Sequence, residues 1–334
     1  MHNTLIAFSA LGLPVLTFYG MAKLNEAMDE QEARKSYRCW KASLQHTLAP
    51  TPLGTTNSPF FSLSIVIPAY NEAERLPQTL EQLVHYLKFQ PYKSEILVVD
   101  DGSTDTTASL VKAFIQEEAS APVTLQLLQN PRNYGKGASV QHGFLQAKYR
   151  YSLLFDADGA TPIQELERLL KLLLHCPYSM VIGSRVLSDT TVVRKRRWWR
   201  NIMGRVFNQV TRLVVNGIHD TQCGFKLLPT HLAQALVQQQ HERGFAMDVE
   251  LLHLAQAWEV PITEVPVHWV NQSGSKIHPL RDSWRMFWSV VGIFSRSKLN
   301  HYHPPEAQTC ATTASPPSKQ PEHPEQSLPA YQVR

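Results

Sequence analysis

The chain has few cysteines, and their spacing gives them no shared task. The four cysteines among 334 residues stand singly, at Cys39, Cys176, Cys223 and Cys310. No C-x-x-C pair is present, so the sequence excludes a paired-cysteine zinc site and a redox dithiol. The wide spacing also argues against a disulfide framework. We therefore expect reduced cysteines and a folded region that faces the cytosol.

The sequence also lacks a strong excess of charge of either sign. Its formal net charge is +4, with 18% charged residues, so no nucleic-acid partner is expected. Residues 194–200, RKRRWWR, are an exception, with five cations and two tryptophans. Such a segment is typical of a surface that meets solvent or a membrane.

Long hydrophobic runs are missing except near the N-terminus. Residues 5–21, LIAFSALGLPVLTFYGM, form a run of 17 uncharged residues that contains Pro14, which is at the short limit for a membrane helix. Lys and Arg follow this run and none precedes it. This predicts a membrane anchor over 1–24 with the rest of the chain on the cytosolic side. A helix that lies on the membrane surface is the alternative.

Two further segments lack the apolar residues of a packed domain. Residues 25–62 contain APTPLGTTNSP (49–59) and are interpreted as a linker. Residues 300–334 are polar and rich in proline, and we expect them to be disordered. Residues 63–299 are left as one expected globular domain.

Within that domain, apolar strand-like runs alternate with helical patterns. The expected strands are 63–68, 95–100, 123–129, 151–155 and 179–185, and the expected helices are 73–88, 104–118, 137–149 and 161–174. This alternation predicts an α/β fold with a doubly wound, mostly parallel sheet. Beyond residue 186 the alternation weakens, and we expect helices over 198–216, 230–240, 246–257 and 280–298 and a strand over 262–270.

Each of the first five expected strands is followed by polar sequence, which contains glycine at four of the five ends. These ends are PAYNE (68–72), DDGSTD (100–105), NPRNYGKG (130–137), DADGAT (156–161) and GSR (183–185). Open α/β sheets bind ligands at the carboxyl ends of their strands. Helix capping could explain one such end, and we expect Ser103 and Thr104 to cap the helix that follows them. Five ends together predict one ligand pocket.

Two carboxylates one residue apart close the fourth strand. Asp156 and Asp158 flank Ala157, and residues i and i+2 of a strand point to the same side. Both side chains could therefore face one divalent cation. Oxygen ligands suit Mg²⁺ or Mn²⁺, which also bind substrate phosphates. A solvated turn at the end of the strand is the alternative.

The glycine pattern of a dinucleotide-binding fold is missing. PAYNE follows the first strand in place of G-x-G-x-x-G, and Pro68 cannot form that turn. A mononucleotide whose base and ribose meet Asp100 or Asp101 fits better. The loop RNYGKG (132–137) lacks the P-loop spacing, so Lys136 could reach a base or phosphate or could lie in a solvated turn.

Five motifs, in order, resemble the inverting glycosyltransferases of family two, which have the GT-A fold. They are SIVIPAYNEAERL, LVVDDGSTD, NYGKGASV, DADGAT and IGSR, between residues 64 and 185. The second half is similar to the dolichyl-phosphate β-glucosyltransferases of that family in GIHDTQCGFKLL, ERGFAMDVELLHLAQ, PITEVPVHW and GSKIHPLRDSWRM, between residues 217 and 286. The resemblance implies inverting transfer of glucose from UDP-glucose to dolichyl phosphate, with Mg²⁺ or Mn²⁺ as cofactor. It implies a nucleotide-sugar and metal half (63–185) and an acceptor and membrane-docking half (186–299).

The resemblance also implies roles for single residues. The nucleotide-sugar contacts would be Pro68, Tyr70, Glu72, Asp100, Asp101, Lys136, Asp156 and Ala157. The metal would lie on Asp156 and Asp158. The acceptor side of the pocket would contain Asp220, Gln222, Gly224, Phe225 and Lys226.

The implied nucleophile, a lipid phosphate, is already anionic and needs positioning more than deprotonation. The candidate cations for it are Arg185, Arg200 and Lys226. Asp220 and Asp248 are the candidate catalytic acids. The alternatives are that Asp220 pairs with Lys226 and that Asp248, like Glu250, is structural.

A lipid acceptor requires contact with a membrane. The stretch 194–207 supplies Arg194, Arg196, Arg197, Trp198 and Trp199, which suit anionic headgroups and the membrane interface. The stretch 283–299 is either a second docking helix or a core helix with a basic rim. We expect the endoplasmic reticulum membrane in a eukaryote and the plasma membrane in a bacterium. The rival hypotheses are an enzyme similar to dolichyl-phosphate mannose synthase, another polyprenyl-phosphate glycosyltransferase, and a non-catalytic nucleotide-binding membrane scaffold.

Overall fold

The computed structural model describes residues 61–118, 123–187, 211, 214–270, 279–299 and 302, without the side chains of 279–283. The predicted anchor (1–24), nearly all of the predicted linker, the basic stretch 194–200 and the tail apart from Tyr302 lie outside these ranges. Among the helices within them, none is both long enough and apolar enough to cross a bilayer.

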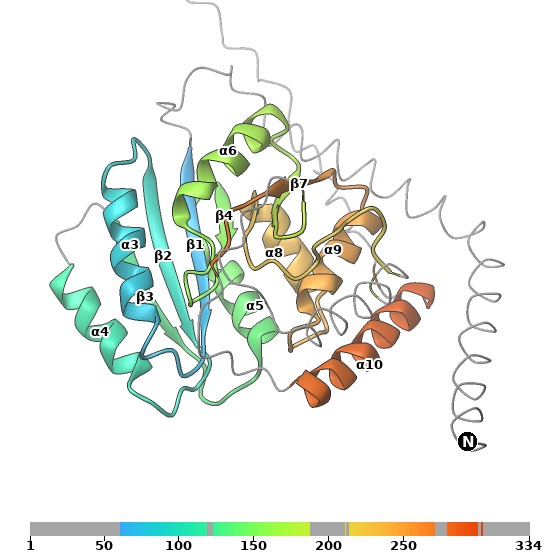
Figure 1. The fold of residues 1–334 in the computed structure, drawn as a ribbon, viewed down its shortest axis with the longest axis horizontal. Helices are drawn as coiled ribbons and strands as arrows, with labels where there is room; N and C mark the ends of the chain where they lie inside the picture. The colour runs from blue at the N-terminus through green and yellow to red at the C-terminus, as the bar shows by residue number, and fades with distance from the viewer. Residues whose placement is uncertain are drawn as a thin grey trace, which may run out of the picture.

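A seven-stranded sheet forms the centre of the described chain (Figure 1). Its strands are β1 (Ser62–Ala69), β2 (Lys93–Asp100), β3 (Thr124–Gln129), β4 (Tyr151–Leu154), β5 (Met180–Ser184), β6 (Lys226–Pro229) and β7 (Ile262–Pro266). Their order across the sheet is β3-β2-β1-β4-β6-β5-β7. Only β6 runs antiparallel to its neighbours in this described sheet. The predicted mostly parallel, doubly wound sheet is therefore confirmed.

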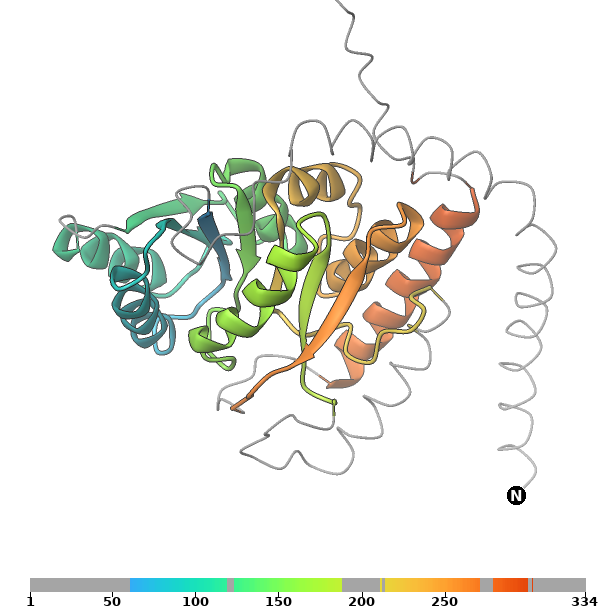
Figure 2. The ribbon, with the colours of Figure 1, turned by 90° about the horizontal axis from the view of Figure 1, so that it is seen from above.

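Helices cover both faces of the sheet (Figures 1 and 2). They are α3 (Leu76–Lys88), α4 (Thr107–Glu117), α5 (Lys136–Gln146), α6 (Leu166–His175), α8 (Thr230–Gln238), α9 (Met247–Ala257) and α10 (Pro279–Lys298), with a 3₁₀ turn over Ile163–Glu165 before α6. One core lies between the sheet and α3, α4 and α6, and the other joins the opposite face to α5, α8 and α9. Helix α10 packs outside α9.

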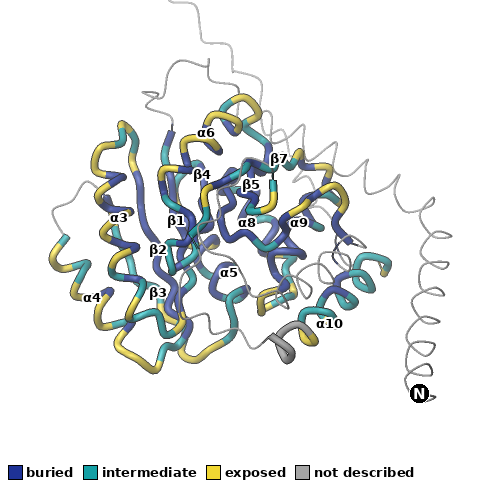
Figure 3. The backbone as a smooth tube through the Cα atoms, viewed as in Figure 1, coloured by how far each residue is buried: buried dark blue, intermediate teal, exposed yellow. Residues whose placement is uncertain are grey.

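Strand β1 shows why a continuous apolar run becomes a central strand. Val66 packs in the core beneath α5, whereas Ile65 and Ile67 pack in the core beneath α3, and all three are fully buried. Because successive side chains point to opposite faces, a strand covered on both sides needs apolar residues at every position. Figure 3 shows the same burial along the central strands and exposure along the outer sides of α3 and α4. Burial of each such side chain stabilises the fold by about 1.5–3 kcal/mol.

Three details differ from the expectations. Strand β6 was not predicted, because a four-residue buried strand carries too little pattern to separate it from a loop. Helix α4 begins at Thr107 with Thr106 at its N-cap, and the Thr107 amide donates to the Asp105 carboxylate, so the predicted capping by Ser103 and Thr104 is wrong. The last strand ends at Pro266, earlier than expected.

Candidate functional site

The carboxyl ends of the parallel strands meet at one edge of the sheet. In the strand register Ala69 of β1 pairs with Asp100 of β2, and Asp100 pairs with Gln129 of β3. Strand β4 ends next to β1, where the amide of Phe155 donates a hydrogen bond to the Val66 carbonyl oxygen. The segments that follow β1, β2, β3 and β4 therefore lie together, as predicted.

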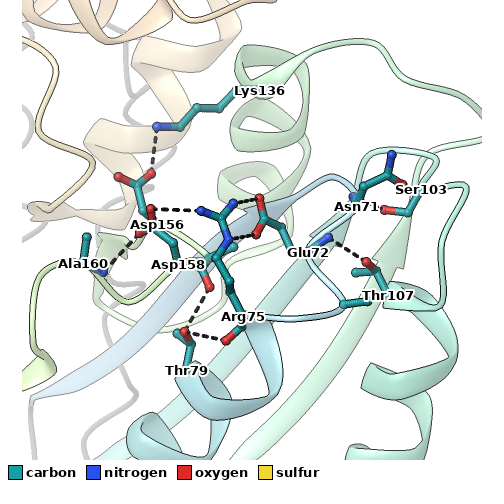
Figure 4. A network of polar contacts seen from close by, with 12 residues as sticks. Asn71, Glu72, Arg75, Thr79, Ser103, Thr107, Lys136, Asp156, Asp158 and Ala160 are labelled. Atoms are coloured by element: carbon teal, nitrogen blue, oxygen red, sulfur yellow. Dashed lines mark hydrogen bonds and ion pairs between the residues drawn. The ribbon is translucent and has the colours of Figure 1, made fainter. Parts of the chain in front are cut away.

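Asp156 and Asp158 follow β4 at this edge, and each already faces a cation (Figure 4). The Lys136 ammonium donates a hydrogen bond of 2.8 Å to Asp156 Oδ1. The Arg75 guanidinium lies 3.7 Å from Asp158 Oδ2. The two carboxylate side chains remain 40% and 30% exposed. They are therefore accessible to a ligand that arrives from solvent.

The two carboxylates differ in how easily they take up a proton. Burial alone would raise the pKa of Asp156, but the charge and hydrogen bond of Lys136 outweigh it, and the pKa falls below its ordinary value. The pKa of Asp158 is raised, by burial and by the nearby charge of Asp156. A cation between them would relieve this repulsion.

Arg75 is the centre of the polar network beside Asp158 (Figure 4). Its guanidinium also contacts both oxygens of Glu72, with Nε 2.7 Å from Oε2. Thr79 links the same helix start to the acids, because its hydroxyl donates a hydrogen bond of 3.0 Å to the Ala157 carbonyl oxygen. The start of α3 and the end of β4 are thus held together.

The residues present fit a Mg²⁺ or Mn²⁺ ion that shares its coordination with a substrate. Two aspartate carboxylates from one strand end supply hard oxygen ligands, which these ions prefer. Within the described part of the chain, no group of three or more His, Cys, Asp and Glu side chains could enclose a metal. An ion held by Asp156 and Asp158 would therefore need further oxygens from water or from a phosphate.

Asp100 and Asp101, which the sequence left as alternatives, have different surroundings. Asp101 accepts hydrogen bonds from the amides of Tyr134 and Gly135 and from Asn130, so it shapes the loop before α5. Asp100 accepts one hydrogen bond of 3.1 Å from the Ser103 amide and a long one of 3.4 Å through its other oxygen. Asp100 is therefore the better candidate for a nucleotide contact.

The loop before β6 lies directly against Asp156. A Cβ atom on Gly224 would fall 2.1–2.3 Å from the carboxylate atoms of Asp156. The amide of Gly183 donates a hydrogen bond to the Phe225 carbonyl oxygen, which fixes this loop to β5. Glycine at 224 is therefore a steric requirement for the observed position of Asp156, and the loop brings the second half of the chain to the site.

Lys226 and Asp248 form a buried ion pair behind that loop. Lys226 Nζ lies 2.6 Å from Asp248 Oδ1, and both side chains are 2% exposed. The same ammonium donates to the Cys223 carbonyl oxygen at 2.5 Å. Asp248 Oδ2 lies 3.7 Å from Lys136 Nζ. This geometry favours the structural alternative for Asp248 and leaves Lys226 no exposed surface for a lipid phosphate.

Arg185 and Asp220 form a second, two-pronged pair. Arg185 Nε and Nη2 lie 2.7 Å and 2.8 Å from the two oxygens of Asp220, and the Arg185 amide donates to the same carboxylate. Burial opposes this charge, but Arg185 lowers the pKa of Asp220 to about 2. The partner of Asp220 is therefore Arg185, and the alternative in which Asp220 pairs with Lys226 is wrong.

Some of the other predicted site residues lie near the site, and the rest lie outside the described residues. Pro68 is the last residue but one of β1, and Tyr70 follows the strand with an exposed side chain, while Ala157 and Phe225 are buried. Gln222 has a buried side-chain nitrogen without a hydrogen-bond partner among the described residues. The predicted acceptor and membrane contacts outside the described residues are Arg194, Arg196, Arg197, Trp198, Trp199 and Arg200.

Helix α10 combines both alternatives that the sequence left open for 283–299. Val290 and Ile293 are buried against the core. Toward the beginning of the helix, Trp284 and Trp288 are 61% and 54% exposed, and both contact the ring of Phe287. Near its other end, Arg296 Nη2 lies 3.5 Å from Glu250 Oε1. Glu250, the buried residue expected to be structural, also accepts a hydrogen bond from the Tyr302 hydroxyl, beyond the helix.

The sequence analysis missed three residues of the polar network. Arg75 and Thr79 contact the acidic segment directly. Asn71, at φ 54°, joins the first two strand ends, because its side-chain oxygen accepts hydrogen bonds from the amides of Thr104 and Asp105. Arg75 and Asn71 lie inside the motif PAYNEAERL, so position within that motif was the available signal.

Comparisons with known proteins identify the family of this chain. The model of Glycosyl transferase family 2 matches residues 64–229. The dolichyl-phosphate beta-glucosyltransferase of Dictyostelium discoideum is 39% identical over 247 residues, covering 71% of this chain and 75% of the relative. The Homo sapiens protein of the same name is 36% identical over 244 residues, covering 70% and 72%.

Solved structures share the fold at lower sequence identity. Glucosyl-3-phosphoglycerate synthase from Mycobacterium tuberculosis, in complex with UDP, superposes with a TM-score of 0.52 at 17% identity, covering 75% of this chain and 86% of that one. The same enzyme with Mn²⁺, UDP and glucosyl-3-phosphoglycerate gives 0.53 at 17%, with the same coverage. The fold is GT-A-like, as predicted. From the relatives' identity and coverage, the chain belongs to glycosyl transferase family 2 and, within it, to the dolichyl-phosphate beta-glucosyltransferases.

Proposed function

We propose that this chain transfers glucose, with inversion, from UDP-glucose to dolichyl phosphate and releases UDP. The names of relatives that are 34–39% identical support this reaction. The single observation that carries it in the structure is the Asp156 and Asp158 pair, exposed at the edge where the strand ends meet. Solved neighbours of the same fold bind Mn²⁺ together with UDP-glucose, which supports a divalent cation at that pair.

The reaction needs no proton transfer from the acceptor. An anionic phosphate oxygen of the lipid forms a bond to the anomeric carbon while the bond from that carbon to the β-phosphate oxygen breaks. The leaving UDP keeps the bonding electrons, and attack from the opposite face inverts the centre. A bound divalent cation supplies neutralisation of the charge that develops on the departing diphosphate.

The chain's own residues would hold and orient the two substrates. Asp156 and Asp158 would hold the cation, and Lys136 lies close enough to Asp156 to reach a diphosphate bound there. Of the candidate cations within the described residues, Arg185 is the one that could contact the acceptor phosphate, because its side chain is 20% exposed. Its ion pair with Asp220 holds the guanidinium in place.

The lipid acceptor also calls for a membrane-facing surface, and α10 supports one. Its exposed Trp284, Arg285 and Trp288 combine interfacial aromatic rings with a cation. The stretch 194–200 would add a basic patch, and 1–24 an anchor. We place this surface on the cytosolic side of the endoplasmic reticulum membrane, since the relatives with this name include human and slime-mould proteins.

A donor screen tests the reaction. Purified full-length protein is given dolichyl phosphate, Mg²⁺ or Mn²⁺, and radiolabelled UDP-glucose, UDP-galactose or GDP-mannose in turn. We expect labelled lipid from UDP-glucose alone, and loss of that product when a chelator removes the metal. Transfer only from GDP-mannose would replace this reaction by the mannosyl alternative, and absence of any transfer together with intact UDP binding would favour a scaffold.

Vesicle flotation tests the membrane surface. The variant Trp284→Ser/Trp288→Ser should bind anionic vesicles about tenfold more weakly than the parent protein, because two interfacial rings are lost. Phe89→Ser is the matched control, since Phe89 is 76% exposed on the far side of the sheet, after α3. Equal binding by both variants would remove α10 from the membrane surface.

A further inference from the structure

The two aspartates proposed to hold the cation are already neutralised by the protein itself. Asp156 has Lys136 at 2.8 Å, and Asp158 has Arg75 at 3.7 Å. A divalent cation that binds the Asp156 carboxylate would lie beside the Lys136 ammonium and compete with it for Oδ1. Because the two positive charges repel at this short range, metal binding would favour movement of the lysine side chain.

Among the described residues, one carboxylate besides Asp156 lies within 4 Å of the Lys136 ammonium. That anion is Asp248, whose Oδ2 lies 3.7 Å from Lys136 Nζ. The other oxygen of Asp248 is already bound by Lys226 at 2.6 Å. A metal alone at Asp156 would thus leave Lys136 beside a dication, with a carboxylate that another lysine already neutralises.

A nucleoside diphosphate changes this balance. Its phosphate oxygens would lie on the metal and would give Lys136 a new anionic partner within reach of its flexible stem. The Lys136 side chain is 17% exposed, so it borders the open site and is not fully enclosed in the core. The same movement that frees Asp156 for the metal would bring the ammonium to the diphosphate.

We propose that Lys136 is an exchangeable counter-ion, which neutralises Asp156 in the free protein and passes to the donor's diphosphate when metal and nucleotide bind together. This role rests on the proposed function, because it assumes the cation site at Asp156 and Asp158. Its consequence is that metal and nucleotide bind with strong positive coupling, and that Lys136 is the source of that coupling.

Electron paramagnetic resonance of Mn²⁺ tests the exchange without any turnover. Free Mn²⁺ is titrated into the full-length protein, alone and with saturating UDP. We expect the Lys136→Met variant to bind Mn²⁺ alone at least about tenfold more tightly than the parent, because no ammonium competes for Asp156. With UDP present, we expect the same variant to bind Mn²⁺ at least about tenfold more weakly, because the diphosphate has lost its partner.

If Lys136→Met raises Mn²⁺ affinity without UDP and lowers it with UDP, these opposite changes distinguish exchange from simpler roles of the lysine. A lysine that only positions Asp156 would weaken Mn²⁺ binding in both titrations when removed. A lysine that only binds phosphate would leave the titration with Mn²⁺ alone unchanged. Either result overturns the proposal. Lys148→Met is the control, since it removes an exposed lysine just beyond the far end of α5, and Lys136→Arg should keep the parent's coupling.

The unaltered protein provides a test that does not depend on a variant's folding. Its affinity for Mn²⁺ must rise at least about tenfold when UDP is added. Equal Mn²⁺ affinity with and without UDP would overturn the exchange while leaving the metal site intact. Absence of Mn²⁺ binding in both titrations would instead refute the metal site of the proposed function.

Discussion

Two pairs of aspartates in this chain have cationic partners, yet their surroundings are opposite. Asp156 and Asp158 lie at the open edge of the sheet, with side chains 40% and 30% exposed. Asp220 and Asp248 lie behind them, with side chains 6% and 2% exposed. Exposed ion pairs contribute little to stability and exchange readily, whereas a buried charge that loses its partner destabilises the fold strongly. The comparison supports the proposed ligand-binding role of Asp156 and Asp158 and favours a structural role for Asp220 and Asp248.

The largest expected effect is a loss of activity when charge is removed from the exposed pair, Asp156 and Asp158. Asp158→Asn should reduce glucose transfer about a thousandfold, because the site loses an anionic ligand for the cation that neutralises the leaving diphosphate. Its thermal midpoint should stay close to that of the parent. Glu81→Gln, on the exposed side of α3, serves as the control in the same assay. Turnover at the parental rate would remove Asp158 from the chemistry.

Loss of a cation beside the buried acids, Asp220 and Asp248, should lower the stability of the fold. Lys226→Met leaves Asp248 buried beside Lys136 alone, and we expect the free energy of unfolding to fall by about 3 kcal/mol in denaturant titrations. The double variant Lys226→Met/Asp248→Leu should recover much of that loss, since it leaves no buried charge unpaired. A Lys226→Met protein with parental stability but without transfer would instead return Lys226 to the role of acceptor contact.

Gly224 lies where the two regions touch, so its substitution should affect both properties. In Gly224→Ala the new methyl group must displace the Asp156 carboxylate or the loop before β6. We expect a loss of about 2 kcal/mol in unfolding free energy together with reduced transfer. Gly244→Ala is the matched control, because a Cβ there meets nothing within 4 Å. Similar behaviour of the two variants would contradict the tight contact.

The smallest expected effect is a change in stability at acid pH. The pKa of Asp220 is lowered from 3.8 to about 2 by Arg185, against the opposing effect of burial. A lowered folded-state pKa stabilises the protein above the unfolded value and ceases to do so as pH falls through the folded value. The stability difference between the parent and Asp220→Asn should thus include at most about 2 kcal/mol from this linkage near neutral pH, lost between about pH 4 and pH 2. A difference that stays constant over that range, measured by denaturant titration, would show that the ion pair does not control the titration.

The exposed and buried aspartates also show which features of the structure could be predicted from the sequence and which could not. Continuous β-branched runs such as SIVIP specify buried parallel strands locally, so the sheet and the gathering of strand ends were predictable. The partners of the acids were not. Arg185 reaches Asp220 across 35 residues and Lys226 reaches Asp248 across 22, and sequence alone did not distinguish Arg185 from Lys226 as the partner of Asp220. Arg75 was missed for the same reason, since its link to Asp158 exists only after the chain has folded.

Strand β6 has a consequence for how the protein is made. In the sheet it lies between β4 and β5, two strands that follow one another along the chain. Among the described strands, β5 pairs with β6 and β7 alone. A nascent chain that has just emerged up to Ser184 therefore has no place to dock its fifth strand until residues 226–229 leave the ribosome. A fragment that stops at residue 185 would expose an unpaired strand, and the donor-binding half cannot be expected to fold by itself.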